Sequence, residues 1–463
     1  MREDEQDGRT GVVAPSTAGA GDLERAVELH RQGNDGDAWA LYERVLTKVP
    51  EDPTALHYAG LLAWTHGERE LGIAMIRRAL GHAPDYVDAH NNLGNVFKVD
   101  NRLGEADACY RRALELDPDA IDPTINLGVL ARARGEFDVA ERHYRRALEL
   151  SPENPLVFLN LSGLLERQGR THEALDMLQS AIAGTVREDV SQRPLLLRRA
   201  NILRVLGRES ETRVIYERLL ESNPDDELAC HMLAALTGEN VPARPDERYV
   251  RNLFDSFSQS FDEVLDNLDY RAPELVGAVV ARLYGAGTGS LRVLDAGCGT
   301  GLCGQYLRAV SGTLDGVDLS SGMLARAAVS GHYDRLVEAE ITAFLRQVDA
   351  PFDLIVSADT FCYFGALDEL FGVAAAALAP GGHLVFTVER EDGPAPAGFL
   401  LNPHGRYGHT RDGVSAELRG AGLSVGGIDE VVLRRERGEP VHGFLVTAHA
   451  AGDARDRAPA RVH

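Results

Sequence analysis

The chain has few cysteines, few tryptophans and a shortage of positive charge. Its 463 residues include five cysteines and two tryptophans, and its 71 Asp and Glu residues outnumber its 48 Lys and Arg residues. The cysteines, at positions 109, 230, 298, 303 and 362, are odd in number and form no CxxC pair, so neither a disulfide framework nor a metal site is expected. Unpaired cysteines fit a reducing cytosol, and we predict a cytoplasmic protein.

The negative balance argues against two classes of partner. A formal net charge of −23 repels nucleic acid and anionic membrane surfaces, although it says nothing about a local basic patch. The longest apolar stretch, residues 371–386, is broken by Pro380-Gly381-Gly382 and is too short to span a bilayer. The first residues lack the basic start and apolar core of a signal peptide. We therefore expect neither a nucleic acid nor a membrane as a partner.

Length and composition predict several domains. A chain of 463 residues exceeds one ordinary hydrophobic core, which favours two to four domains. Both ends are polar and rich in Gly and Ala, so residues 1–20 and 451–463 are predicted to be disordered. Residues 239–247 carry two prolines, and we interpret them as a linker between a repeat domain, residues 21–238, and a second domain, residues 248–450.

An internal repeat of 34 residues fills the first half of the chain. Small residues recur in one frame with prolines at Pro50, Pro84, Pro118 and Pro152. Small residues let two helices approach closely, and the proline closes the second helix of each pair. The pattern resembles tetratricopeptide repeats and predicts an α-solenoid of six helical pairs followed by a capping helix. Such a solenoid is expected to present a concave groove.

Three asparagines share one position of this repeat: Asn92, Asn126 and Asn160. Asparagine is a poor helix former, so three in register call for a reason. An amide offers one acceptor and two donors, which matches one peptide unit of an extended chain. The arrangement resembles the asparagine ladder of the O-linked N-acetylglucosamine transferase, which implies that the groove binds a peptide or protein. The alternative is a duplicated residue that only caps or solvates the inner face.

The second domain opens with a strand, a glycine-rich turn and a helix. Asp295 ends the predicted strand, and Gly297, Gly299 and Gly301 follow at alternate positions. Glycines let a nucleotide-like ligand approach bare backbone at a helix N-terminus. Together with Gly304, two of them also satisfy the dinucleotide fingerprint, so the turn alone leaves a dinucleotide cofactor open.

The residues that flank the turn favour S-adenosylmethionine. The carboxylate of Asp295 would repel a pyrophosphate but tolerates an ammonium and a sulfonium. Asp318 ends the next predicted strand, where an acid can accept hydrogen bonds from two ribose hydroxyls. The runs VLDAGCGTG, VDLSSGMLARA and FDLIVSADTFCYF together resemble class I S-adenosylmethionine-dependent methyltransferases, over residues 248–449.

The resemblance implies a fold and a cofactor site. The fold is an α/β Rossmann-like domain with a seven-stranded, mostly parallel sheet, and the alternation of predicted strands and helices agrees with it. Glu340 stands where the family usually has an aspartate for the adenine amino group. The implied cofactor-binding residues are Asp295, Gly297, Cys298, Gly299, Gly301, Asp318, Leu319, Met323, Glu340, Ile341 and Ala358.

Methyl transfer needs positioning and desolvation more than acid–base chemistry. A base is required only when the acceptor must lose a proton, and the candidates are His404, Tyr407 and His409 in a predicted loop after the fifth strand. The alternative is an ordinary polar loop. Two predicted helices before the glycine-rich turn are expected to cover the site, with aromatic residues that serve either as a lid or as core. These lid candidates are Phe254, Phe257, Phe261 and Tyr270.

The sequence therefore predicts an S-adenosylmethionine-dependent methyltransferase whose repeats bind a peptide or protein acceptor. Two alternatives stay open. In the first, the acceptor is a small molecule and the repeats serve homodimerisation or docking. In the second, the chain is a repeat scaffold without catalytic activity.

Overall fold

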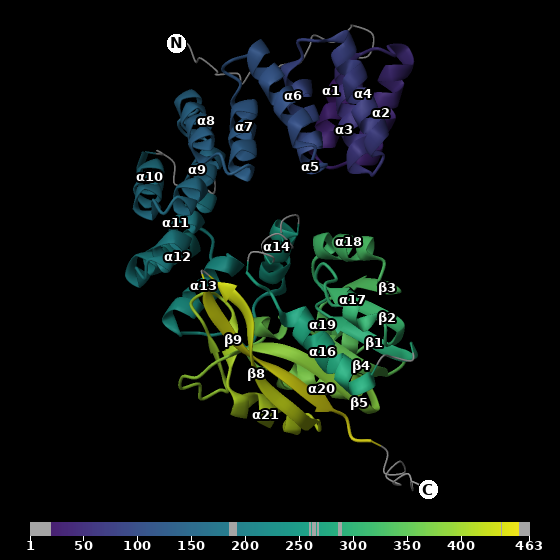
Figure 1. Ribbon diagram of the computed structural model, residues 1–463. Coiled ribbons are helices and arrows are strands. Elements are labelled where there is room, and N and C mark those ends of the chain that lie inside the picture. Colours follow the sequence, from purple (N-terminus) through teal and green to yellow (C-terminus); the bar gives the residue numbers. More distant parts are fainter. Residues whose placement is uncertain are drawn as a thin grey trace. The chain divides into compact units, whose positions relative to one another are not determined.

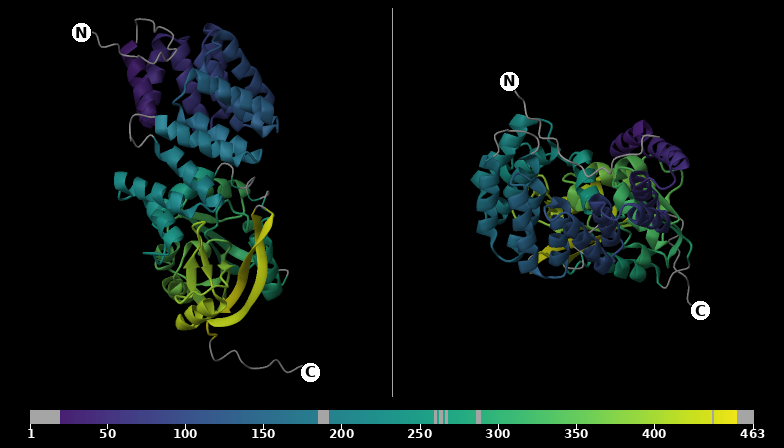
Figure 2. Two further views of the ribbon diagram at one scale, coloured as in Figure 1. Left: turned by 90° about the vertical axis from the view of Figure 1, so that its left-hand side faces the viewer. Right: turned by 90° about the horizontal axis from the view of Figure 1, so that it is seen from above.

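The computed structural model describes residues 20–184, 192–258, 261, 265, 268–285, 289–436 and 438–452. The chain divides into two compact units, Met1–Gly207 and Arg208–His463. Figure 1 and Figure 2 show helices alone in the first unit, and a sheet with covering helices in the second. The ends predicted to be disordered lie outside the described residues, apart from Ala20, Ala451 and Gly452.

The first unit is built from antiparallel helix pairs at the predicted spacing. The first helices of the second to fifth pairs begin at residues 53, 87, 121 and 155, 34 residues apart. The two helices of each pair pack against each other. The helices are α1 (Ala20–Arg31), α2 (Asp35–Lys48), α3 (Pro53–Thr65), α4 (Arg69–His82), α5 (Val87–Val99), α6 (Leu103–Leu116), α7 (Ile121–Ala133), α8 (Phe137–Leu150), α9 (Pro155–Arg167), α10 (Thr171–Gly184) and α11 (Arg193–Val205).

Glycine and tyrosine fit together inside these pairs. A Cβ on Gly94 would lie 2.5 Å from Cε1 of Tyr110, and a Cβ on Gly128 would lie 2.5 Å from Cε1 of Tyr144. Both tyrosines are fully buried. The space that each glycine leaves open is therefore filled by an aromatic ring, which explains why this repeat position holds small residues.

The second unit begins with helices that belong to the repeat pattern. α12 (Glu209–Ser222) and α13 (Glu227–Thr237) complete the sixth pair and the predicted cap. The chain then crosses the predicted linker, which is hydrogen-bonded to the α/β part of the unit. Gly365 N and Ala366 N donate to the carbonyl of Ala243 at 2.8 and 3.0 Å, and Tyr407 Oη donates to the carbonyl of Pro242 at 2.8 Å. The division between the units falls ahead of this linker.

Over the described residues, the sheet of the second unit has nine strands, so the predicted number of seven is wrong, whereas the predicted fold class is confirmed. β3, β2, β1, β4 and β5 run parallel in that order, β7 and β6 extend it, and β9 pairs antiparallel with both β5 and β8. The bounds are β1 (Leu291–Ala296), β2 (Ser311–Asp318), β3 (Arg335–Glu338), β4 (Phe352–Ser357), β5 (Leu378–Arg390), β6 (Phe399–Leu401), β7 (Tyr407–His409), β8 (Ser424–Glu436) and β9 (Glu439–His449).

The two additional strands, β6 and β7, lie in a segment that reads as a loop. Each has three residues, too few for an alternating pattern to be recognised. β7 pairs with the end of β5, so its backbone groups are satisfied by tertiary contacts that no local pattern reveals.

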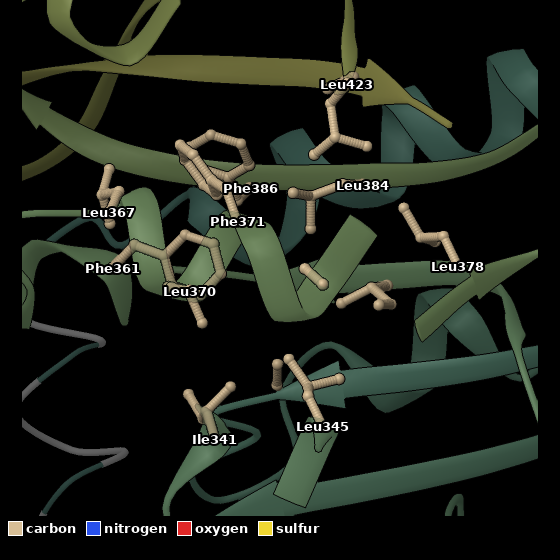
Figure 3. Packing of buried hydrophobic residues seen from close by; sticks show 14 of the residues in the cluster. Ile341, Leu345, Phe361, Leu367, Leu370, Phe371, Leu378, Leu384, Phe386 and Leu423 are labelled. Atoms are coloured by element: carbon tan, nitrogen blue, oxygen red, sulfur yellow. The ribbon is translucent and has the colours of Figure 1, made fainter. Parts of the chain in front are cut away.

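Helices cover both faces of the sheet. One core layer includes Phe371 and Phe386, whose ring centroids are 5.2 Å apart, and Figure 3 shows this layer with Leu384 and Leu423. The opposite layer holds Val280 beside Leu354. The helices are α14 (Glu247–Phe257), α16 (Ala272–Tyr284), α17 (Gly304–Leu307), α18 (Ser321–Ser330), α19 (Ile341–Leu345), η2 (Phe361–Tyr363), α20 (Asp368–Ala377) and α21 (Arg411–Gly420).

α16 therefore packs on the sheet and is not a lid, which corrects the prediction for the second of the two helices before the turn. Its buried valines, Val276, Val279 and Val280, join the core instead. Over the described residues, no helix has the length and apolarity that a membrane crossing requires.

We predict that Gly94→Ala destabilises the repeat unit by about 1–3 kcal/mol, because the added methyl group overlaps the Tyr110 ring. Gly104→Ala in α6 is the matched control. A Cβ there meets nothing within 4 Å, so alanine should be neutral or stabilising by about 0.5–1 kcal/mol. Thermal unfolding monitored by circular dichroism measures both. Equal effects of the two substitutions would contradict the packing argument.

Candidate functional site

The glycine-rich turn lies at the carboxyl edge of the sheet, after β1. Gly297, Gly299 and Gly301 have φ angles of 76°, 53° and 90°, which glycine adopts without strain. A Cβ on Gly297 would lie 2.4 Å from Thr360 Oγ1, whereas a Cβ on Gly299 would meet nothing within 4 Å. The turn therefore packs tightly against Thr360 and is open beside Gly299.

Asp318, at the end of β2, is joined to this open position. Its Oδ2 accepts a hydrogen bond from Gly299 N at 2.9 Å, and its Oδ1 accepts one from Ser320 N at 2.9 Å. Burial raises the pKa of Asp318, although these backbone hydrogen bonds act in the opposite direction. A carboxylate has about four acceptor sites, so this group can accept further hydrogen bonds beside the opening.

Asp295, at the end of β1, is more deeply buried, with 1% of its surface exposed. The hydroxyl of Tyr333 donates to Asp295 Oδ2 at 2.7 Å. Burial is the largest cause that raises the pKa of Asp295 to about 7. The Tyr333 hydrogen bond opposes this rise, and the charge of Asp318 contributes to it. Tyr333 was not predicted, because a lone tyrosine before a short strand carries no sequence signal.

Glu340 caps the N-terminus of α19. Its Oε2 accepts hydrogen bonds from Ala343 N at 2.8 Å and from the Thr342 hydroxyl. Its Oε1 is buried and has no hydrogen-bond partner among the described residues, with Arg244 Nη1 at 3.6 Å. A buried oxygen without a donor is a site where a ligand N–H group can be accepted.

The other predicted cofactor-binding residues surround the same strand ends. Leu319 follows β2 directly, and Met323 lies in the first turn of α18 with its side chain fully buried. Ile341 begins α19, and Ala358 follows β4. Burial raises the pKa of the Cys298 thiol well above its ordinary value, which makes it an unreactive, small residue in the turn.

A network of charged side chains occupies the ends of β4, β5 and β8. Arg434, 3% exposed, donates from Nη1 to both oxygens of Asp359 at 2.9 and 2.7 Å. It also donates from Nε to Glu436 at 2.8 Å and from Nη2 to Glu389. Arg406 donates from Nε to Glu389 at 2.6 Å and from Nη2 to Glu436. Burial acts to raise the pKa of Glu436, but the charges and hydrogen bonds of the two arginines outweigh burial and lower this pKa to about 2.

This network holds Asp359 in an unusual backbone conformation. Asp359 has a φ of 56°, which is uncommon for a residue with a side chain. The bidentate contact with Arg434 and the hydrogen bond from Asp359 N to Thr387 Oγ1 at 2.8 Å stabilise it. Conformations of this kind persist where surrounding contacts fix them, often at functional sites.

Of the three predicted catalytic residues, only His404 lies in the charged network. Its Nε2 is 3.5 Å from Glu389 Oε2, and its side chain is 33% exposed. The Tyr407 side chain is fully buried. His409 Nε2 donates to the carbonyl of Gly365 at 3.0 Å, and burial lowers the pKa of His409 to about 4. Tyr407 and His409 are thus enclosed in β7, away from solvent.

The loop that carries His404 rests on the last repeat helix. His231 of α13 is buried, and its Nε2 donates to the carbonyl of Gly405 at 2.8 Å. Its ring lies 4.7 Å from that of Tyr249. Sequence reasoning assigned α13 to the repeats alone, so it missed this contribution to the α/β part.

α14, which carries lid candidates, contacts the residues that follow β2. Arg251 Nε donates to the carbonyl of Leu319 at 3.3 Å, and Asp255 accepts hydrogen bonds from the Ser320 hydroxyl and, at 3.4 Å, from Gly322 N. The lid candidate Phe254 has its ring 6.1 Å from that of Phe261 and 5.2 Å from that of Tyr363. The side chain of the candidate Phe257 lies outside the described residues, and Tyr270 is half-buried.

In the first unit, the three ladder asparagines do not make equivalent contacts. Asn92 Nδ2 donates to His57 Nε2 at 3.1 Å, and Asn126 Nδ2 donates to Asn91 Oδ1 at 3.0 Å, so both reach the preceding repeat. Asn160 Nδ2 donates to the carbonyl of Leu156 in its own helix at 3.0 Å. Two of the amides therefore join neighbouring repeats, and the third is held only locally.

Comparison with known protein families identifies both parts of the chain. A methyltransferase domain model matches residues 268–418, and tetratricopeptide repeat models match residues 87–120 and 119–185. The chain carries tetratricopeptide repeats and a methyltransferase domain. The predicted classes of both parts are thereby confirmed.

Curated methyltransferases match part of the chain. A malonyl-[acyl-carrier protein] O-methyltransferase of Geobacter sulfurreducens is 32% identical over 149 residues, which is 31% of this chain and 54% of that protein. The chain thus spans about half the length of this relative.

Two solved structures align with portions of the chain. Magnesium protoporphyrin IX methyltransferase from Synechocystis PCC 6803 aligns with 44% of this chain and 100% of its own, at 16% identity and a TM-score of 0.36. PilF of Pseudomonas aeruginosa aligns with 46% of this chain and 94% of its own, at 20% identity and a TM-score of 0.38.

We predict that Asp295→Asn stabilises the protein more at pH 8 than at pH 5. In the unfolded chain an aspartate ionises near pH 4, whereas Asp295 stays protonated up to about pH 7 in the fold. Wild-type stability should therefore fall as the pH rises between these values, by up to about 4 kcal/mol in total. Asparagine cannot ionise and keeps an acceptor for Tyr333.

Thermal unfolding across this pH range provides the measurement. Asp349→Asn, at an exposed position of the same domain, is the control and should give no pH-dependent gain. A gain from Asp295→Asn that is equal at both pH values would show that the carboxyl group is not held protonated.

Proposed function

We propose that the methyltransferase domain binds S-adenosylmethionine and transfers its methyl group to a peptide or protein bound by the repeats. The single observation that supports this proposal most strongly is the open turn at Gly299, flanked by the carboxyl groups of Asp318 and Asp295. The carboxyl group of Asp318 suits a ligand with ribose hydroxyls. The buried carboxyl group of Asp295 and the backbone N–H groups of the turn suit the amino acid portion of that ligand, which carries a positive charge.

The donors and acceptors of the chain fit this cofactor in number and type. Asp318 would accept hydrogen bonds from the ribose hydroxyls, because a carboxylate oxygen that accepts a backbone N–H group can accept a further donor. Glu340 Oε1, buried without a hydrogen bond among the described residues, would accept one from the adenine amino group. Asp295, which is only partly ionised near neutral pH because its pKa is about 7, would pair in its ionised form with the ammonium of the methionine portion.

Apolar and backbone surfaces would complete the cofactor site. Leu319, Met323 and Ile341 would pack near the adenine, in line with their places beside Asp318 and Glu340. The backbone of Gly297, Cys298, Gly299 and Gly301, with Ala358 opposite, would face the methionine portion and the methyl group.

S-adenosylmethionine supplies a methyl group on a positively charged sulfur, ready for in-line displacement. The chain therefore has to orient the acceptor and exclude water, for which α14 and its aromatic residues are suitably located. Where the acceptor must lose a proton, His404 is the candidate base. Burial lowers its pKa, which keeps it neutral near pH 7, and Glu389 at 3.5 Å would stabilise the protonated form.

The repeats would present the acceptor through the ladder asparagines. Asn160 is the least engaged of the three, because among the described residues its amide bonds only within its own helix. Asn92 and Asn126 would bind a peptide with the part of each amide that does not contact the preceding repeat. The acceptor named for the Geobacter sulfurreducens relative is itself carried on a protein, which is compatible with delivery by a protein-binding domain.

Calorimetric titration with S-adenosylmethionine tests the cofactor. We expect saturable binding by the wild-type chain and at least a roughly tenfold loss of affinity in Asp318→Ala, because two charge-assisted hydrogen bonds of about 1–2 kcal/mol each are removed. Asp349→Ala, which removes an exposed charge, should bind normally. The absence of heat with wild-type protein at millimolar ligand would refute the enzyme proposal.

Transfer of label from methyl-labelled S-adenosylmethionine in host lysate tests the acceptor. We expect label in the protein fraction and a several-fold decrease with Asn160→Ala. The melting temperature and the cofactor affinity should not change, because the hydrogen bond that is lost joins Asn160 to the carbonyl of Leu156 in the same helix. Label confined to small molecules would support the small-molecule alternative. Cofactor binding without any labelled product would support the scaffold alternative.

A further inference from the structure

One short loop carries two of the polar side chains in the charged network. Residues 402–406 join β6 to β7, and we call them the His404 loop. His404 and Arg406 stand on either side of Gly405, and both approach Glu389. Arg406 Nε donates to Glu389 at 2.6 Å, and His404 Nε2 lies 3.5 Å from Glu389 Oε2. The backbone at Gly405 therefore determines where both side chains are placed.

One peptide unit of the His404 loop is hydrogen-bonded on both sides. The carbonyl of Gly405 accepts a hydrogen bond from His231 Nε2 at 2.8 Å. The N–H group of the same unit belongs to Arg406, and it donates to His404 Nδ1 at 3.4 Å. A planar trans peptide directs its C=O and N–H groups to opposite sides. The unit thus joins a histidine of α13 to the histidine of the loop, and we call these two hydrogen bonds the histidine relay.

His231 acts as a fixed donor in the histidine relay. It is 3% exposed, and burial lowers its pKa, although its hydrogen bond to Gly405 acts in the opposite direction. A neutral imidazole has a single N–H group. Because Nε2 donates to a carbonyl, the proton of His231 is on Nε2, and Nδ1 carries a lone pair.

The second nitrogen of His231 shows that packing alone does not account for a histidine at this position. Its Nδ1 is buried and has no hydrogen-bond partner among the described residues. A buried polar atom without a partner costs free energy, which an apolar side chain of similar size would avoid. The hydrogen bond to Gly405 is what the histidine provides and an apolar residue does not.

Gly405 is packed tightly against α13 and α14. Its φ of 89° suits glycine, and a Cβ there would lie 3.0 Å from Sδ of Met232 and 3.4 Å from Oη of Tyr249. The ring of Tyr249, from α14, also lies 4.7 Å from that of His231. Both ends of the histidine relay belong to one compact unit, Arg208–His463. These two helices therefore set the position of the Gly405 carbonyl.

The histidine relay determines which nitrogen of His404 is basic. Because Arg406 N donates to Nδ1, the neutral ring carries its proton on Nε2, which faces Glu389. The lone pair on Nδ1 then remains as the proton acceptor. At 3.4 Å, the contact of Nδ1 with Arg406 N is longer than an ordinary N–H hydrogen bond, so it orients the ring without preventing protonation.

We propose that His231 of α13 is a positioning residue for methyl transfer, which acts through the Gly405–Arg406 peptide to fix the orientation and the tautomer of His404. That the histidine relay serves methyl transfer rests on the proposed function, in which His404 is the base. The last helix of the repeat pattern thereby supports the candidate site, besides capping the repeats.

Nuclear magnetic resonance of the full chain with ¹⁵N-labelled histidine rings tests the histidine relay, and His404→Gln assigns the signals of His404. We expect neutral His404 to be protonated on Nε2 in the wild type. His231→Leu removes the donor, so the Nδ1-protonated form should become populated, and the pKa of His404 should rise toward its ordinary value as the loop loosens. His231→Gln keeps an N–H group at a similar reach and should preserve the wild-type tautomer.

Met232→Leu is the packing control, because Met232 packs against Gly405 and has no N–H group to donate. It should leave the tautomer of His404 unchanged. An unchanged tautomer in folded His231→Leu, or a His231→Gln spectrum like that of His231→Leu, would overturn the proposal. Melting temperatures identify a variant that fails to fold. The wild-type spectrum is decisive even then, since His404 protonated on Nδ1 excludes the histidine relay.

Transfer of label from methyl-labelled S-adenosylmethionine in host lysate separates this proposal from the proposed function. We expect at least about a tenfold loss in His231→Leu and a loss within about threefold in His231→Gln, because a general base contributes about 10²–10⁴-fold. Full transfer by His404→Gln would refute the proposed base. Unchanged transfer by His231→Leu, together with deficient transfer by His404→Gln, would refute the role of His231 alone.

Discussion

Two acidic side chains at adjacent strand ends, Asp295 and Asp318, determine how the rest of the methyltransferase domain is arranged around its turn. Both are removed from water, and the charge of Asp318 raises the free energy of ionising Asp295. The two buried carboxyl groups receive different hydrogen bonds from the fold. Asp318 receives two backbone N–H groups, whereas Asp295 receives one hydroxyl and is held partly protonated near neutral pH. A site that keeps such a pair stores unfavourable electrostatic free energy that a cationic ligand would release.

The charged network around Arg434 plays a comparable role on the other side of the sheet's carboxyl edge. A single guanidinium ties together the ends of β4, β5 and β8, and it contacts Asp359 across 75 residues of sequence. Removing any one member would leave its partners charged, buried and unpaired. This lowers the stability of the fold more than replacing the whole network by apolar residues would. The network therefore acts as a rigid support for the His404 loop and for the strained Asp359.

Periodic and local features could be predicted from the sequence, and features that depend on distant residues could not. The repeat follows from a fixed spacing of prolines and small residues, and the turn follows from glycines that adopt positive φ. The contact between Tyr333 and Asp295, and that between Arg434 and Asp359, leave no local pattern. β6 and β7 are too short to be recognised, which is why Tyr407 and His409 appeared to lie in an open loop.

The asparagine ladder illustrates the same limit within a repeat. The register of Asn92, Asn126 and Asn160 is plain in the sequence, but the partner of each amide depends on the residue about one repeat earlier. The residue at that earlier position is His57 for Asn92 and Asn91 for Asn126, and both accept a hydrogen bond. For Asn160 the residue at that position is Ile125, whose side chain cannot form a hydrogen bond. The amide of Asn160 therefore bonds to its own helix.

The division of the chain inside its sixth helical pair has a consequence for how such proteins can diversify. α12 and α13 are grouped with the methyltransferase domain, and His231 of α13 is bonded to the loop at Gly405. Gene fusion or exchange at the proline-containing linker would separate these partners and uncover the apolar surface of Leu401 and Tyr407. Whole repeats can be gained or lost ahead of residue 208, while the last helices are inherited together with the enzyme.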